Sequence, residues 1–107
     1  MSLDVYLVDP EEGYVYSANI THNLGRMARE AGIYQHLWRP EEISLTKAGE
    51  LIETLQTGLA DMVRRPSHYE QFNAENGWGL YGNFLPWIAK YLEACIANPD
   101  ATIEVSR

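Results

Sequence analysis

The residues best suited to chemistry are Thr21-His22-Asn23, which lie near the start of a predicted helix. His22 can donate, accept or transfer a proton near neutral pH. The amides of Asn19 and Asn23 can hydrogen-bond a ligand. A helix N-terminus offers free N–H groups and a partial positive charge, so it can hold an anion. These residue types indicate a small polar site that binds a ligand or, with His22 as general acid or base, assists a reaction.

A second stretch with functional potential covers residues 73–83, which hold three glycines, Trp78 and Tyr81. Asn76-Gly77 favours a tight turn because both residues tolerate positive φ. The commoner arrangement for such a glycine-bent connector places Trp78 and Tyr81 on the core. Asn83 is expected to cap the helix that follows. We hypothesise that the loop lies opposite the first helix and forms a shared pocket, with five residues as ligand contacts: Asn19, His22, Asn23, Trp78 and Asn83.

The segment Gly77-Trp-Gly-Leu-Tyr-Gly82 matches the pattern G-x-G-x-x-G, but we reject a dinucleotide site. That fingerprint requires a buried strand immediately before it. Residues 69–76 are polar and not strand-like, and too few residues follow to complete a nucleotide-binding fold. No cofactor is therefore expected.

Neither a metal site nor a cysteine nucleophile is predicted. His22, His36, His68 and Cys95 are far apart in the sequence and lack paired ligand spacing. Cys95 falls on the apolar stripe of the last predicted helix, where burial makes a thiol inert. No residue is therefore assigned as catalytic.

The composition limits the function classes further. The chain has 107 residues, one cysteine and a net charge of −7. Because the only basic pair is Arg64-Arg65, direct nucleic-acid binding is not expected. No apolar run reaches membrane-spanning length and no signal peptide is visible, so we expect a cytoplasmic protein. Its acidity leaves open a role as inhibitor or decoy of a DNA-binding protein.

The elements that must position these residues predict an α+β fold in a single domain over residues 1–107. Residues 3–8 are β-branched and aromatic, which is typical of a strand, and residues 14–16 can return as the second arm of a hairpin. Residues 102–106 alternate apolar and polar side chains, as a half-buried strand does. We expect a small antiparallel sheet, from the N-terminal strand or hairpin and the C-terminal strand, covered by three main helices.

The three helices are predicted from apolar residues at helical spacing over residues 19–31, 45–65 and 82–97. Asn19 or Thr21 is expected to cap the first helix, and Ser44 or Thr46 the second. Glycines inside the long second helix are expected to allow close packing of another element. Apolar surface left on that helix would permit a homo-oligomer.

Five short stretches resemble small uncharacterised proteins of prophage type, encoded in bacteriophages and bacterial genomes. They are Ile20-Thr-His-Asn-Leu24, Glu30-Ala-Gly-Ile-Tyr34, Leu37-Trp-Arg-Pro40, Asn76-Gly-Trp-Gly79 and Glu104-Val-Ser-Arg107. The resemblance implies a bacterial or phage-infected cell and an accessory role, and it implies no catalytic residue. The leading expectation is a non-enzymatic accessory module that binds a protein partner or a small ligand. The alternative is a small enzyme that uses His22 and an anion at the first helix N-terminus.

Overall fold

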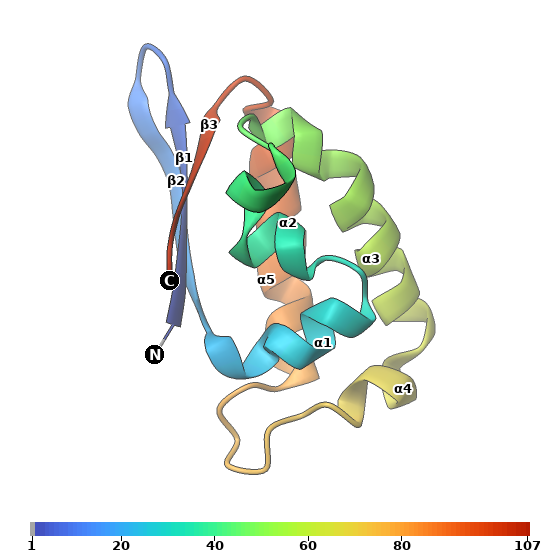
Figure 1. Cartoon of the computed structure of the whole chain (residues 1–107). Coiled ribbons are helices and arrows are strands. Elements are labelled where there is room, and N and C mark those ends of the chain that lie inside the picture. The colour runs from blue at the N-terminus through green and yellow to red at the C-terminus, as the bar shows by residue number, and fades with distance from the viewer. Residues whose placement is uncertain (1) are drawn as a thin grey trace.

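The computed structural model describes residues 2–107 as a three-stranded antiparallel sheet with helices packed on one face (Figure 1). Strands β1 (Ser2–Asp9) and β2 (Gly13–Thr21) form a hairpin, and β3 (Thr102–Ser106) pairs with the other side of β1, giving the order β2-β1-β3. This confirms the predicted α+β fold. The helical elements between β2 and β3 are a 3₁₀ turn at His22–Leu24, α1 (Gly25–Glu30), α2 (Tyr34–Trp38), 3₁₀ turns at Pro40–Ile43 and Ala48–Leu51, α3 (Ile52–Arg64), α4 (Pro66–Glu70) and α5 (Tyr81–Ala97).

The central strand β1 connects the sheet to the helical core. Its alternate residues Leu3, Val5 and Leu7 are fully buried beneath the helices. Successive strand side chains point to opposite faces, so this alternation fixes which face of the sheet packs inward. The register pairs Val5 with Ala18 of β2 and with Val105 of β3. Ala18 and Val105 therefore lie on the same face of the sheet as the buried Val5.

The first helix is shorter than the predicted residues 19–31, and that prediction was wrong at its start. Strand β2 continues to Thr21, so Asn19 and Ile20 are strand residues. Thr21 keeps an extended backbone, and its Oγ1 accepts the Asn23 N–H at 3.2 Å to begin the 3₁₀ turn. Pairing with β1 overrides the local helical spacing, because Ile20 is buried equally well on the inner face of the sheet.

The long helix begins at Ile52 rather than at residue 45. The segment before it is hydrogen-bonded to the chain around the start of β3, which keeps it from extending the α-helix: Ala48 N–H to Ala101 O, Gly49 N–H to Pro99 O, and Ile103 N–H to Thr46 O, each at 2.9 Å. The Glu50 carboxylate accepts the N–H groups of Thr46 and Lys47. The Glu50 side chain therefore provides the capping hydrogen bonds before α3, and the predicted caps Ser44 and Thr46 do not.

Helix α5 matches its predicted span closely, but Asn83 is not its cap. Asn83 is the third residue of the helix, and its own N–H bonds to Leu80 O at 3.0 Å. The side chain of Asn73 takes over the role, since its Oδ1 accepts the Tyr81 N–H at 2.7 Å. Because Asn73 supplies the capping hydrogen bond, the exposed side-chain amide of Asn83 has no structural task at the helix start.

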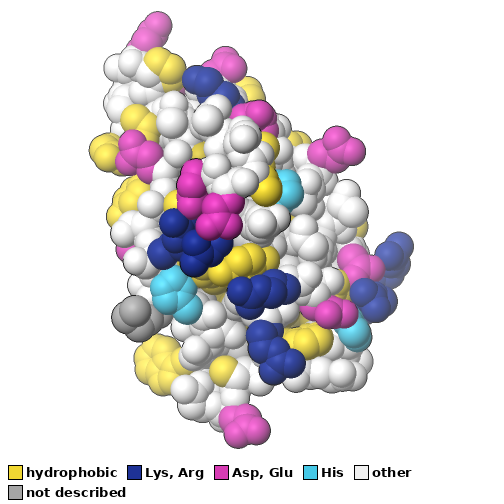
Figure 2. Space-filling view, in the orientation of Figure 1, with side chains coloured by type: hydrophobic (Ala, Val, Ile, Leu, Met, Phe, Trp, Pro, Cys, Tyr) yellow, Lys and Arg dark blue, Asp and Glu magenta, His cyan; other side chains and the backbone are white. Residues whose placement is uncertain are grey.

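The Lys and Arg residues are unevenly distributed between the sheet and the helices. All eight Lys and Arg residues lie outside the three strands, whereas β1, β3 and the hairpin turn hold Asp4, Asp9, Glu11, Glu12 and Glu104. Figure 2 shows Lys and Arg side chains gathered over the middle of the helical side of the molecule.

Gly58 in α3 provides a test of the predicted close packing. A Cβ placed on Gly58 would overlap Ile33 Cγ2 and would lie 3.1 Å from Ala31 O, a contact to the loop after α1. We expect Gly58→Ala to lower the free energy of unfolding by about 1–2 kcal/mol, because overpacking outweighs the gain in helix propensity. Urea denaturation would measure it.

Gly82→Ala in α5 is the matched control, since a Cβ there meets nothing within 4 Å. Its unfolding free energy should stay level or rise by up to about 1 kcal/mol. Equal stabilisation by both substitutions would contradict the packing account.

Candidate functional site

A cleft of about 690 Å³ opens where the end of β2, the first 3₁₀ turn, the loop before α5 and the first turns of α5 meet. The structure brings all five residues of the predicted patch to its walls: Asn19, His22, Asn23, Trp78 and Asn83. Thr21 and Asn76, from the two predicted stretches, also line the cleft, as do Ser2 and Trp87, which were not predicted to do so. Because β2 continues to Thr21, the polar residues after it arrive at the end of the sheet beside the glycine loop.

A hydrogen bond from Asn23 joins the first 3₁₀ turn to the loop before α5. Asn23 Nδ2 donates to the backbone carbonyl of Trp78 at 2.6 Å, across 55 positions of sequence. The Trp78 N–H in turn donates to Asn76 Oδ1 at 2.9 Å. Gly79 has a φ of +131°, and a Cβ there would lie only 3.0 Å from Asn23 Cβ. Glycine is therefore required at Gly79 both for its backbone conformation and for the close approach of Asn23.

The Trp78 ring is exposed although its backbone is held on both sides. Its relative exposure is 72 %, so the expectation that it lies on the core was wrong. Tyr81 is half-buried, and its hydroxyl donates to Met62 O at 2.7 Å. Because hydrogen bonds to the backbone order the loop, the loop does not depend on burial of the indole. An apolar ring is thus presented to solvent from a fixed position.

His22 is oriented by a buried tryptophan, Trp38, a pairing that could not be predicted from the sequence. Trp38 Nε1–H donates to His22 Nδ1 at 2.9 Å, and Trp38 is only 3 % exposed. An indole nitrogen can only donate, so Nδ1 carries the acceptor lone pair and the ring hydrogen lies on Nε2. Tyr34 stacks on Trp38 with ring centroids 5.3 Å apart, and Arg29 lies over Tyr34 at 3.9 Å. His22 is therefore fixed as an Nε2–H donor.

Asn19 has a structural role that limits its part in binding. Its Nδ2 donates to Ser2 Oγ at 2.9 Å and to Asp4 Oδ1 at 2.7 Å, which uses both amide hydrogens. Its backbone carbonyl accepts the Trp87 indole N–H at 3.0 Å. Asn19 therefore fixes the wall of the cleft, and Trp87 contributes only an apolar ring surface.

The expected anion site at a helix N-terminus does not form. Helix α1 has six residues and begins at Gly25, and the Asn23 N–H before it is taken by Thr21. Among the described residues that line the cleft there is no Asp, Glu, Lys or Arg. The polar side chains on the described walls of the cleft are amides, hydroxyls, indoles and one imidazole.

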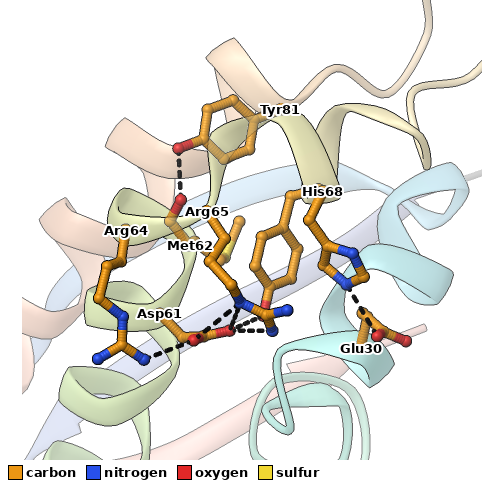
Figure 3. Close-up of polar contacts among 8 residues, drawn as sticks. Glu30, Asp61, Met62, Arg64, Arg65, His68 and Tyr81 are labelled. Atoms are coloured by element: carbon orange, nitrogen blue, oxygen red, sulfur yellow. Dashed lines mark hydrogen bonds and ion pairs between the residues drawn. The ribbon is translucent and has the colours of Figure 1, made fainter.

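A second polar cluster joins the end of α3 to α4 (Figure 3). Arg64, Arg65 and the Tyr69 hydroxyl all donate to the Asp61 carboxylate. Hydrogen bonds from Arg65, Tyr69 and Arg64 hold the pKa of Asp61 far below its usual range. Burial, and then Asp61, raise the pKa of Tyr69 to about 12. Asp61 is thus ionised and Tyr69 protonated at neutral pH, so this pair stabilises the corner and does not exchange protons there.

Cys95 is fully buried in α5, and burial raises the pKa of its thiol to about 12. The predicted burial of Cys95 is confirmed, and the thiol stays protonated at neutral pH. Within residues 2–107, no three His, Cys, Asp or Glu side chains come together as metal ligands.

Comparisons with protein-family models, with curated proteins and with solved structures give no match to this chain. The resemblance to prophage-type proteins therefore stays a prediction. None of the helices formed by residues 2–107 is long and apolar enough to cross a membrane.

The bond between Asn23 and Trp78 can be tested by removing its donor. Asn23→Ala should loosen the loop, with backbone amide exchange over residues 74–80 about fivefold faster, the effect of losing about 1 kcal/mol of net hydrogen bonding. Hydrogen exchange followed by NMR would measure it. Asn83→Ala, which keeps the backbone bond from Asn83 N–H to Leu80 O and removes only the side-chain amide, is the control. Equal exchange in both variants would contradict the role given to Asn23.

The Asp61 cluster predicts a pH dependence. Because the folded-state pKa of Asp61 is depressed, its ionised form stabilises the fold above about pH 4, near the pKa of an unfolded aspartate. That stabilisation is lost as pH falls from there through the depressed pKa. Urea unfolding should therefore show a stability gap between wild type and Asp61→Asn that is constant from about pH 8 to about pH 5 and narrows below about pH 4. A gap that widens in acid would contradict this assignment. Glu53→Gln, at an exposed carboxylate of α3, is the control.

Proposed function

We propose that this protein is a non-enzymatic binding module that takes a small ligand in the cleft between the end of β2 and the glycine loop. The observation that carries the proposal is the exposed Trp78 ring on a backbone fixed by Asn23 and Asn76. A binding surface ordered in advance loses less conformational entropy when its ligand arrives. An exposed, anchored indole is otherwise a liability, since apolar surface favours burial.

The shape of the site supports a small ligand over a protein partner. Its volume of about 690 Å³ lies within the roughly 300–1,000 Å³ that small-molecule sites occupy. Such sites combine apolar walls with a few well-placed polar groups. Here Trp78 and Trp87 supply the apolar surface, and His22 and Asn83 supply polar groups.

The state of His22 favours binding over catalysis. A general base needs a free lone pair within reach of the substrate. The Nδ1 lone pair of His22 accepts from Trp38, which leaves a hydrogen on Nε2. A neutral imidazole in this state serves as a hydrogen-bond donor. With the anion-binding helix start also missing, little supports the enzymatic alternative.

The resemblance noted in the sequence suggests where the module acts. We propose an accessory role in the cytoplasm of a bacterial or phage-infected cell. Binding of a small ligand there would let the protein sense or sequester a metabolite without converting it.

A thermal-shift screen tests this function. The panel would hold neutral metabolites, sugars, nucleosides and phosphorylated compounds, run on wild type and on Trp78→Ala. A ligand at a hundredfold excess over its Kd stabilises the folded state by about 2.7 kcal/mol, so the midpoint rises by several degrees. We expect at least one small molecule to raise the wild-type midpoint and to lose that effect in Trp78→Ala.

Two controls separate lost binding from lost folding. Trp78→Ala removes an exposed ring, so the unfolding free energy without ligand should change by less than about 0.5 kcal/mol. Tyr14→Ala removes another exposed aromatic ring, 68 % exposed on the sheet and away from the cleft, and should keep the response. A ligand response that survives in Trp78→Ala would place binding elsewhere and contradict the proposal.

A further inference from the structure

We infer that the ligand of the cleft is a neutral heteroaromatic ring of nucleobase type, presented as a free base or a nucleoside. This inference rests on the proposed function and names its ligand class. Three properties of the cleft carry it: the charge of its walls, the state of the Trp78 ring, and the hydrogen-bonding groups that the fold leaves available.

The walls select against charged ligands. No Asp, Glu, Lys or Arg is found among the described lining residues, and His22 holds its Nδ1 as an acceptor toward Trp38. A phosphate or carboxylate brought into this cleft would lose hydration without meeting an opposite charge. Arg26 and Arg29 are the nearest cations along the chain, and they lie over the Phe72 and Tyr34 rings rather than in the cleft.

The exposed indole of Trp78 offers a flat platform. Its backbone N–H and C=O are both engaged, so the peptide is fixed while the residue as a whole is 72 % exposed. Stacking of a base on an aromatic ring is sequence-tolerant because every base has a π-face. A planar ligand ring is therefore the partner that covers the most indole surface at once.

The polar groups around the platform match the edge of a base. His22 Nε2–H is a donor. The Asn83 amide carries a donor and an acceptor side by side, and it is available to a ligand because Asn73 caps α5 instead. Asn23 uses Nδ2 on Trp78, which leaves its Oδ1 as an acceptor. An amide side chain pairs in two places with a base edge that carries a donor next to an acceptor. Sugar hydroxyls rotate and present no such fixed edge.

The test is a titration followed by NMR on ¹⁵N-labelled protein. The ligands are adenosine, guanosine, cytidine and uridine, each compared with its 5′-monophosphate and with methyl glucoside and methyl galactoside. The readouts are the Trp78 indole N–H, assigned with Trp78→Phe, and the Asn83 side-chain amide. We expect at least one nucleoside to shift both signals, and its monophosphate to bind no more tightly.

Variants separate edge recognition from simple stacking. Trp78→Ala should weaken nucleoside binding roughly 5- to 150-fold, the range measured for base stacking on aromatic side chains. Asn83→Ala should weaken it roughly fivefold or more, since a paired donor and acceptor are lost. Glu93→Ala, an exposed change on the same helix outside the cleft, should leave the affinity unchanged.

Each other outcome overturns a defined part of the account. Nucleoside binding that survives in Asn83→Ala would be stacking on Trp78 alone and would overturn the inference. Tighter binding of the monophosphates would mean an anionic ligand. Binding of the methyl glycosides alone, lost in Trp78→Ala, would overturn the nucleobase class and keep the proposed function. If no small molecule in either screen binds in a Trp78-dependent way, the inference and the proposed function both fail.

Discussion

The hydrogen bond from Asn23 to the backbone carbonyl of Trp78 is the contact on which the cleft depends. It connects the chain just after the hairpin to the loop just before α5, two segments that the fold brings together at one end of the sheet. Its short length, 2.6 Å, goes with the close approach that Gly79 permits. Without this bond, the loop would keep its internal turn contacts, and the bond from Trp87 Nε1–H to Asn19 O would be the hydrogen bond left between the cleft walls within residues 2–107.

The fixed state of His22 follows from a similar constraint. Trp38 is buried, and its backbone carbonyl accepts a hydrogen bond at 2.7 Å from Arg107, the residue after β3. A buried indole N–H needs an acceptor, and His22 Nδ1 provides it. The tautomer is thus imposed by the core. The hydrogen bond from Trp38 orients the imidazole and also occupies the lone pair that a general base would use. The same contact therefore orders His22 and favours the proposed binding role over catalysis.

Much of the fold could be predicted from local patterns. The span of α5 follows from its apolar stripe, and β3 follows from alternation at Ile103 and Val105. The start of the first helix could not be predicted, because Ile20 suits a buried strand as well as a helix, and only pairing with β1 decides between them. The start of α3 was missed for the same reason, since its preceding residues bond to the segment leading into β3.

The residues of the candidate site could be predicted from the sequence better than the role of each residue. Polar residue types and the Asn-Gly turn indicated Asn23, Trp78 and Asn83, and the cleft gathers them. The sequence could not show that Asn73 caps α5, that Trp38 orients His22, or that Asn19 is held by Ser2 and Asp4. Each of these depends on contacts between distant segments, which residue spacing does not encode.

An unbiased fragment screen by ¹H–¹⁵N NMR on the wild-type protein would test whether the cleft is the ligand-binding surface. It makes no assumption about ligand class and reports where small molecules bind. The account predicts that hits perturb the signals of Asn23, Trp78 and Asn83 around the cleft. The main competing surface is the shallow apolar groove of Leu59, Val63 and Leu92 between α3 and α5. Hits that gather in that groove and leave the cleft signals unmoved would contradict the account.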